Sequence, residues 1–205
     1  MSNILTYTDI ANMAIDWNGG SLSISDINDE HNPDAIVCKR NVKQAIVSEL
    51  DKYEWAFARR VIAPVRDMSG KYDIPGYVTY ILPDDFSRLS MYLFAQLAGL
   101  PVVNEYNKEV TYFVRGKYLY SKTEVKCLAY NSNSVPIAEW PSLFSDCVAL
   151  NLAQRIAGKL KGMDADIAFL EQMYKVKLKD ARRCELITTE ANQGGESILQ
   201  IQRMI

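Results

Sequence analysis

The sequence predicts an α+β protein: an antiparallel helical bundle formed by both chain ends, with an antiparallel β-rich insertion between them. Apolar residues recur at helical spacing in residues 1–60 and 138–190, whereas Val, Tyr, Thr and Phe are prominent in residues 61–137. Prolines in the first part of that middle stretch exclude a continuous helix. We therefore expect a helical body from the two ends, a β-rich domain from the middle, and a separate tail at 191–205.

Composition is typical of a globular protein that needs no disulfides. Of the 205 residues, 48% are hydrophobic and 23% are charged, which is enough apolar material for a core. The net charge is −2, so the chain lacks the basic excess usual in proteins that coat DNA. The first residues do not resemble a signal peptide, and no long apolar run suits a membrane span, so we expect assembly in the cytosol.

Two helices are expected before the insertion. Thr6 or Thr8 can cap the first, which continues to about Trp17, where an Asn-Gly-Gly sequence ends it. The second runs from about residue 34 to residue 53, because Pro33 suits a first helical turn. Its expected buried stripe contains Ala35, Val42, Ala45, Ile46 and Leu50. Its outer face is expected to carry Lys39, Arg40, Lys43, Glu49, Asp51 and Lys52.

The middle of the chain is expected to form short strands separated by turns. Pro83-Asp84-Asp85-Phe86 has the composition of a turn, and Arg115-Gly116-Lys117 that of a tight hairpin turn. The expected strands lie at 77–81, 89–94, 102–106, 110–114, 117–121 and 125–130.

Two more helices are expected after the insertion. One begins at Trp140-Pro141 and ends at Lys161-Gly162, and it is apolar around so much of its circumference that it should be central. The last runs from about residue 164 to residue 188. Its inner face is expected to include Ile167, Leu170, Met173, Tyr174 and Ala181.

The tail contains glycines and then spaced apolar residues. This pattern is typical of an arm that docks on a partner, although a frayed terminus has the same composition. The residues predicted to dock on a neighbouring subunit or on another protein are Ile198, Leu199, Ile201 and Met204.

No constellation of residues suits catalysis or a metal site. His31 is the only histidine, and the helix expected after Pro33 separates it from Cys38. No two cysteines have CxxC spacing. Asp84 and Asp85 are adjacent, and neighbouring side chains on an extended chain point to opposite faces. We expect neither an enzyme nor a bound metal or cofactor.

Two features could mediate contacts with other molecules. Most of the twelve tyrosines lie between residues 72 and 130, and tyrosine is common in protein interfaces. The last helix carries a basic face at i, i+4 and i+7 spacing, formed by Lys175, Lys179, Arg182 and Arg183. A solvated surface is the simplest interpretation of that face, and an interface with an acidic partner or the lining of a DNA channel is the alternative.

Two segments resemble a known family. The first segment, which is taken as the close of the second helix, is Tyr53-Glu54-Trp55-Ala56-Phe57-Ala58-Arg59-Arg60. The second follows later in the chain and is Tyr80-Ile81-Leu82-Pro83-Asp84-Asp85-Phe86-Ser87-Arg88-Leu89. Together they resemble the tail tubular protein A family, the head-to-tail adaptors of short-tailed bacteriophages. The C-terminal third is similar to the same family, with Trp140-Pro141-Ser142-Leu143-Phe144 opening a helix that contains Ala149-Leu150-Asn151-Leu152-Ala153, so the resemblance covers roughly residues 6–190. The residues that carry the resemblance are Trp55, Phe57, Arg59, Arg60, Tyr80, Leu82, Pro83, Asp85 and Arg88.

The resemblance implies a structural role in a virion. Such adaptors form a dodecameric ring under the portal protein, help retain packaged DNA, and provide the attachment platform for the tail nozzle protein. Double-stranded DNA passes through the ring lumen, and the ring is assembled in the host cytoplasm. A soluble nucleic-acid-binding accessory protein, using the basic last helix and the tyrosine-rich strands, is the alternative.

Overall fold

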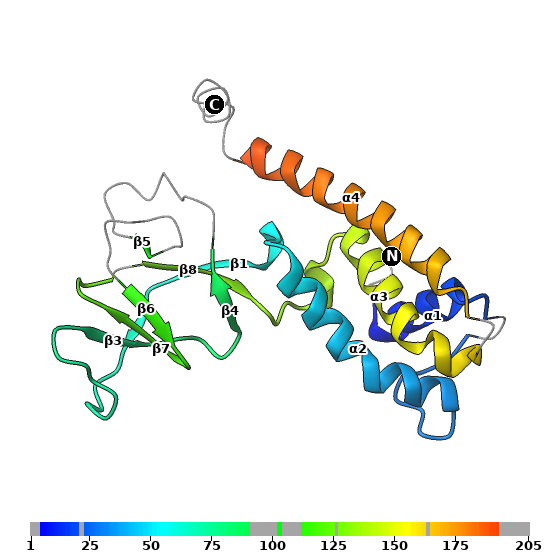
Figure 1. Cartoon of the computed structure of the whole chain (residues 1–205), viewed down its shortest axis with the longest axis horizontal. Coiled ribbons are helices and arrows are strands. Elements are labelled where there is room, and N and C mark those ends of the chain that lie inside the picture. Colours follow the sequence, from blue (N-terminus) through cyan, green and yellow to red (C-terminus); the bar gives the residue numbers. More distant parts are fainter. Residues whose placement is uncertain are drawn as a thin grey trace. The chain divides into compact units, whose positions relative to one another are not determined.

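The computed structural model describes residues 5–20, 23–90, 102–103, 112–125, 127–162 and 165–192 (Figure 1). It has the α+β composition that the sequence predicts. The chain divides into two compact units: Met1–Lys52 with Val135–Ile205, and Tyr53–Ser134. We call these the helical unit and the β unit.

In the helical unit, three helices pack on a fourth. Helices α1 (Tyr7–Trp17), α2 (Pro33–Lys52) and α4 (Ile167–Asn192) each contact α3 (Ser142–Leu160), as Figure 1 shows. A short 3₁₀ helix, η2 (Ile137–Glu139), precedes α3. Because α3 is surrounded, most of its side chains are buried, including the polar Ser145 and Asn151.

Local signals set the ends of α1. Thr6 forms a capping box, in which Asp9 N donates to Thr6 Oγ1 at 3.2 Å and Thr6 N donates to Asp9 Oδ2 at 2.8 Å. Thr8, the other candidate cap, accepts a hydrogen bond from Ile27 N instead. At the other end, Gly19 has a φ of 68°, a left-handed conformation that glycine adopts without strain.

Two side chains of the helical unit lie on the opposite face from the one expected. Glu49 is completely buried, because the buried stripe of α2 runs through Cys38, Ala45 and Glu49 at helical spacing. Ile167 is 46% exposed, because the buried face of α4 starts at Leu170. The last helix also begins and ends a few residues later than predicted.

The β unit contains two four-stranded sheets among its described residues. One has β1 (Arg59–Ile62), β8 (Cys127–Ser132) and β4 (Phe86–Leu89) in that order, with β5 (Val102–Val103) also on β8. The other has the order β2 (Val65–Arg66), β3 (Val78–Ile81), β7 (Tyr118–Ser121) and β6 (Tyr112–Arg115). Their shared core consists of Tyr80, Leu82, Leu89, Leu119, Val125, Leu128 and Tyr130.

The boundary between helical and β structure differs from the one predicted. Helix α2 ends at Lys52, and Arg59 and Arg60 already pair with Asn131 and Tyr130 of β8. The run that was taken as the close of the second helix therefore lies in the β unit, as a short 3₁₀ helix, η1 (Ala56–Ala58), and the start of β1. The units divide at 52/53 and 134/135, where the sequence suggested 60/61 and 137/138.

The strands also differ in detail. Strand β5 pairs with β8 in parallel, so one of the sheets is mixed rather than purely antiparallel. The strand expected at 89–94 lies at Phe86–Leu89, and residues 91–94 are outside the described residues. Strands β1 and β2 are short and lie on either side of Pro64.

Candidate functional site

Three of the residues that carry the family resemblance are buried in the β unit. Trp55 is buried and contacts the rings of Tyr53 and Phe57 at 5.3 and 6.0 Å between centroids. Tyr80 is buried on β3, and its hydroxyl accepts a hydrogen bond from Val125 N at 2.8 Å. Leu82 packs in the same core. These side chains stabilise the fold and leave little surface for a ligand.

Two polar members of that set, Arg59 and Arg60, interact with groups near them in sequence. Arg60 Nη1 donates to the backbone carbonyls of Phe57 and Arg59, at 2.8 and 3.0 Å. Arg59 Nε lies 3.4 Å from Glu54 Oε1, and both side chains are nearly buried.

The adjacent carboxylates Asp84 and Asp85 bind different partners. Asp84 pairs with Lys117 at 2.9 Å in full solvent, and this pairing lowers the pKa of the Asp84 carboxyl. Asp85 accepts a hydrogen bond from the Tyr130 hydroxyl at 3.0 Å. Burial, followed by that hydrogen bond, raises the pKa of Tyr130 to about 12.

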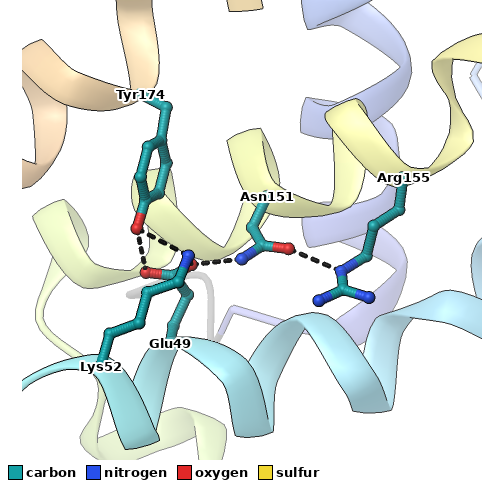
Figure 2. A network of polar contacts seen from close by, with 5 residues as sticks. All are labelled: Glu49, Lys52, Asn151, Arg155 and Tyr174. Carbon is teal, nitrogen blue, oxygen red and sulfur yellow. Dashed lines mark hydrogen bonds and ion pairs between the residues drawn. The ribbon is translucent and has the colours of Figure 1, made fainter. Parts of the chain in front are cut away.

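A buried polar network joins three helices of the helical unit (Figure 2). At its centre is the Glu49 carboxylate of α2. It accepts hydrogen bonds from Asn151 Nδ2 of α3 and from the Tyr174 hydroxyl of α4, the latter at 2.9 Å. Lys52 Nζ lies 2.8 Å from Glu49 Oε1 and 3.0 Å from the Tyr174 hydroxyl. Arg155 Nε extends the network by donating to Asn151 Oδ1 at 2.6 Å.

This network fixes the position of α4 relative to α2 and α3. A buried carboxylate is stable only when donors and a cation surround it, and here they come from all three helices. Burial, and then the charge of Glu49, raise the pKa of Tyr174 above its ordinary value, so its hydroxyl stays protonated and donates. Sequence analysis missed Glu49, although its spacing of four residues from the buried Ala45 was an available signal.

The one histidine and its nearest cysteine do not form a catalytic pair. His31 is exposed before α2, and its backbone N donates to Asp29 Oδ1. Cys38 is buried in α2, where burial raises the pKa of its thiol to about 11. The thiol therefore stays protonated near neutral pH and is a poor nucleophile.

The predicted basic residues lie on the exposed part of α4. Lys175, Lys179, Arg182 and Arg183 are all exposed. Lys175 makes an i,i+4 ion pair with Glu171 at 2.7 Å. Lys177, which lies nearer the buried face, pairs with Asp146 of α3 at 2.8 Å. Phe169 and Val176, both almost half exposed, lie on the same helix.

One face of the second sheet carries a continuous row of aromatic rings. Successive centroids from Tyr72 through Tyr118, Tyr120 and Phe113 to Tyr77 are 4.6, 6.5, 4.8 and 5.2 Å apart. The ammonium groups of two lysines lie over the end rings: that of Lys71 over Tyr72, and that of Lys122 over Tyr77. Tyr72 and Phe113 are more than one-third exposed, and Val65 and Ile81 are also exposed on this sheet. We call this row the aromatic face.

A shallow hollow lies beside α1. Its described lining is Met13, Asp16 and Trp17, and its volume is about 290 Å³. The ring of Phe169 from α4 contacts Trp17 at 6.4 Å between centroids. Phe169 is 44% exposed, so the apolar surface continues from the hollow onto the start of α4.

The described residues contain neither a cluster of metal ligands nor a helix that could cross a membrane. No group of three or more His, Cys, Asp or Glu side chains in them is placed to hold a metal ion. None of the described helices has the length and apolar character needed to cross a bilayer. The predicted docking residues Ile198, Leu199, Ile201 and Met204 lie outside the described part of the chain.

No family model matches the chain, and no curated protein matches it either.

Proposed function

We propose that this chain is a structural virion protein, a head-to-tail adaptor of a short-tailed bacteriophage. Copies of it form a ring that docks under the portal, helps to retain packaged DNA and holds the tail nozzle. The helical unit forms the ring body, and the β unit faces the tail components. The protein performs no covalent chemistry, and it functions at the head-tail junction of the virion.

The observation that carries this proposal is where the family-like segments lie. Tyr53–Arg60 and Tyr80–Leu89 both belong to the β unit, which is inserted between two helices on each side. The most specific of the resembling residues therefore lie in one compact unit of the protein. Because buried side chains such as Trp55, Tyr80 and Leu82 carry part of the resemblance, it points to a shared fold more than to a shared ligand.

Surface features of both units are consistent with many contacts. A ring subunit makes heterologous contacts on two different sides and binds further partners at its ends. The aromatic face gives the β unit an amphipathic surface with few rotamers to freeze on binding. The exposed α4 residues Phe169 and Val176, next to Lys175 and Lys179, give the helical unit a second mixed surface.

A nucleic-acid-binding accessory protein is the second candidate. The aromatic face favours it, because Lys71 and Lys122 lie beside rings on which bases could stack. Acidic residues near the aromatic face argue against this second candidate, because Asp67, Asp73 and Glu124 are close in sequence to those lysines.

The two candidate functions predict different masses for the assembled protein and a different salt dependence of DNA binding. Light scattering of the purified chain, alone and with the portal protein of the same virus, should give a ring-sized mass if the chain is an adaptor. A chain that remains a monomer with portal, and binds DNA with an affinity that falls steeply with salt, would overturn the adaptor proposal in favour of the second candidate.

A further inference from the structure

The hollow beside α1 has both an apolar and a charged part. Met13 and Trp17 supply the apolar lining, and Phe169 extends it. Asp16 supplies an exposed carboxylate, and no Lys or Arg of the described residues pairs with it. Lys161 donates to the carbonyl of Gly19 at 3.2 Å. Such a hollow suits a segment that offers apolar side chains and one positive charge.

The hollow belongs to the most acidic part of the chain. Residues 1–38 contain six Asp and Glu residues and no Lys or Arg. Residues 172–205 have the opposite balance, with six Lys and Arg residues against four Asp and Glu. Opposite charges at different places on one subunit favour association of one copy with the next rather than face-to-face pairing.

The tail has the composition that the hollow requires. Four apolar residues, Ile198, Leu199, Ile201 and Met204, lie within seven positions, and Arg203 is the one cation of residues 193–205. The basic end of α4 leads directly into it.

A chain cannot place the whole of this segment in its own hollow, because Ile198, Leu199 and Ile201 lie too close to the end of α4 to reach it. Phe169 contacts Trp17 beside the hollow, and α4 continues for 23 residues beyond Phe169 to Asn192. At ~1.5 Å per residue, the helix carries the tail about 35 Å away. Extended chain covers at most ~3.5 Å per residue, so Ile198 lies within about 21 Å of Asn192 and Leu199 within about 25 Å. The apolar group as a whole therefore binds another molecule while α4 is intact.

We propose that residues 198–204 of one chain dock in the Met13–Asp16–Trp17 hollow of a second copy, with Arg203 beside Asp16. The apolar tail residues cover Met13, Trp17 and Phe169, and the basic end of α4 approaches the acidic N-terminal region. This proposal rests on the proposed function, because it names the contact that links neighbouring subunits of the ring.

Cysteine crosslinking tests the contact between two chains. In a Cys184→Ser background, which removes an exposed native thiol, Met13→Cys is placed in one chain and Ile201→Cys in another of different length. Mild oxidation of the mixture should give a crosslinked heterodimer as the main product. A chain that carries both substitutions should give a ladder of linear oligomers. A cyclised monomer, or no heterodimer above the level of random collision, overturns the proposal.

Charge reversal tests the pairing of Asp16 with Arg203. Asp16→Arg and Arg203→Glu should each reduce self-association at least severalfold, and the double variant should recover most of it. Glu124→Arg, an equally exposed reversal in the β unit, is the matched control and should leave association unchanged. Loss of association without recovery in the double variant, in chains with unaltered helical circular dichroism, overturns the Asp16–Arg203 contact.

The results of these experiments also distinguish failure of the tail docking from failure of the adaptor role. If rings with portal form normally in both charge variants and in a chain lacking residues 193–205, the docking is wrong and the adaptor role stands. If deletion of those residues abolishes portal binding, and full-length chains with Met13→Cys and Ile201→Cys do not crosslink, the tail binds the portal and the docking is again wrong. If the chain crosslinks as expected but never binds portal, the docking stands and the adaptor role falls.

Discussion

The Glu49 carboxylate is completely buried, and side chains of three helices surround it. Asn151, Tyr174 and Lys52 each contribute a bond to it. Lys52 is 41% exposed, so solvent screens its contribution, and the buried donors matter more. Because those donors come from α3 and α4, loss of any one of them weakens the packing of helices.

Removing the Tyr174 hydroxyl should therefore destabilise the protein. Tyr174→Phe deletes a hydrogen bond to a buried charged group, which contributes about 2 kcal/mol. Tyr7→Phe is the matched control, because Tyr7 is 44% exposed and no described residue bonds to its hydroxyl. It should change stability by less than about 0.5 kcal/mol. Urea unfolding followed at 222 nm measures both, and equal effects would show that the network does not stabilise α4.

Tyr130 should make the β unit sensitive to alkaline pH. Burial and the hydrogen bond to Asp85 raise its pKa from 10.0 to about 12, so the folded state holds this proton more tightly than the unfolded state does. The resulting stabilisation is complete below about pH 10 and is lost as the pH rises through 12. Between pH 10 and pH 12, the free energy of unfolding should fall more steeply in the wild type than in Tyr130→Phe. Identical slopes in denaturant titrations across this range would contradict the assignment.

At the scale of elements, the sequence predicted the helices better than the strands. Helices of eleven or more residues repeat their apolar spacing several times, and the Thr6 cap and the glycines after α1 and α3 mark their ends. Most strands here have only two to four residues, too few for a clear alternation. The parallel pairing of β5 with β8 depends on contacts distant in sequence, which no local pattern encodes.

The sequence predicted which side chains are buried less well than it predicted where the elements lie. Glu49 was assigned outward because charged residues are rarely buried, and its partners Asn151 and Tyr174 lie over a hundred residues away. The hollow and the aromatic face likewise combine side chains from separate segments, such as Trp17 with Phe169.

Two glycines should respond in opposite ways to the same added methyl group. Gly116 has a φ of 59° in the turn between β6 and β7, so Gly116→Ala should cost about 1 kcal/mol in strain. Gly158 lies within α3 with open space where a Cβ would go, so Gly158→Ala should stabilise by about 0.5–1 kcal/mol. Thermal unfolding of the two variants measures this, and a shift of the same sign would show that these turn and helix assignments are wrong.

At the scale of the whole molecule, the charge distribution and the long α4 favour assembly. The acidic N-terminal region and the basic face of α4 belong to one unit, and Ile198, Leu199 and Ile201 are too close to the end of α4 to reach the hollow of their own chain. Copies that associate in this way join head to tail, and such contacts close into a ring when the rotation between neighbours divides a full turn.

The mass of the complex with portal is the measurement that tests the central proposal most directly. Light scattering of the purified chain mixed with the portal protein of the same virus, with electron micrographs of the same sample, gives both size and symmetry. The adaptor proposal predicts a closed ring of many copies stacked on the portal. A chain that remains monomeric in the presence of portal, at concentrations where portal itself is assembled, would contradict it.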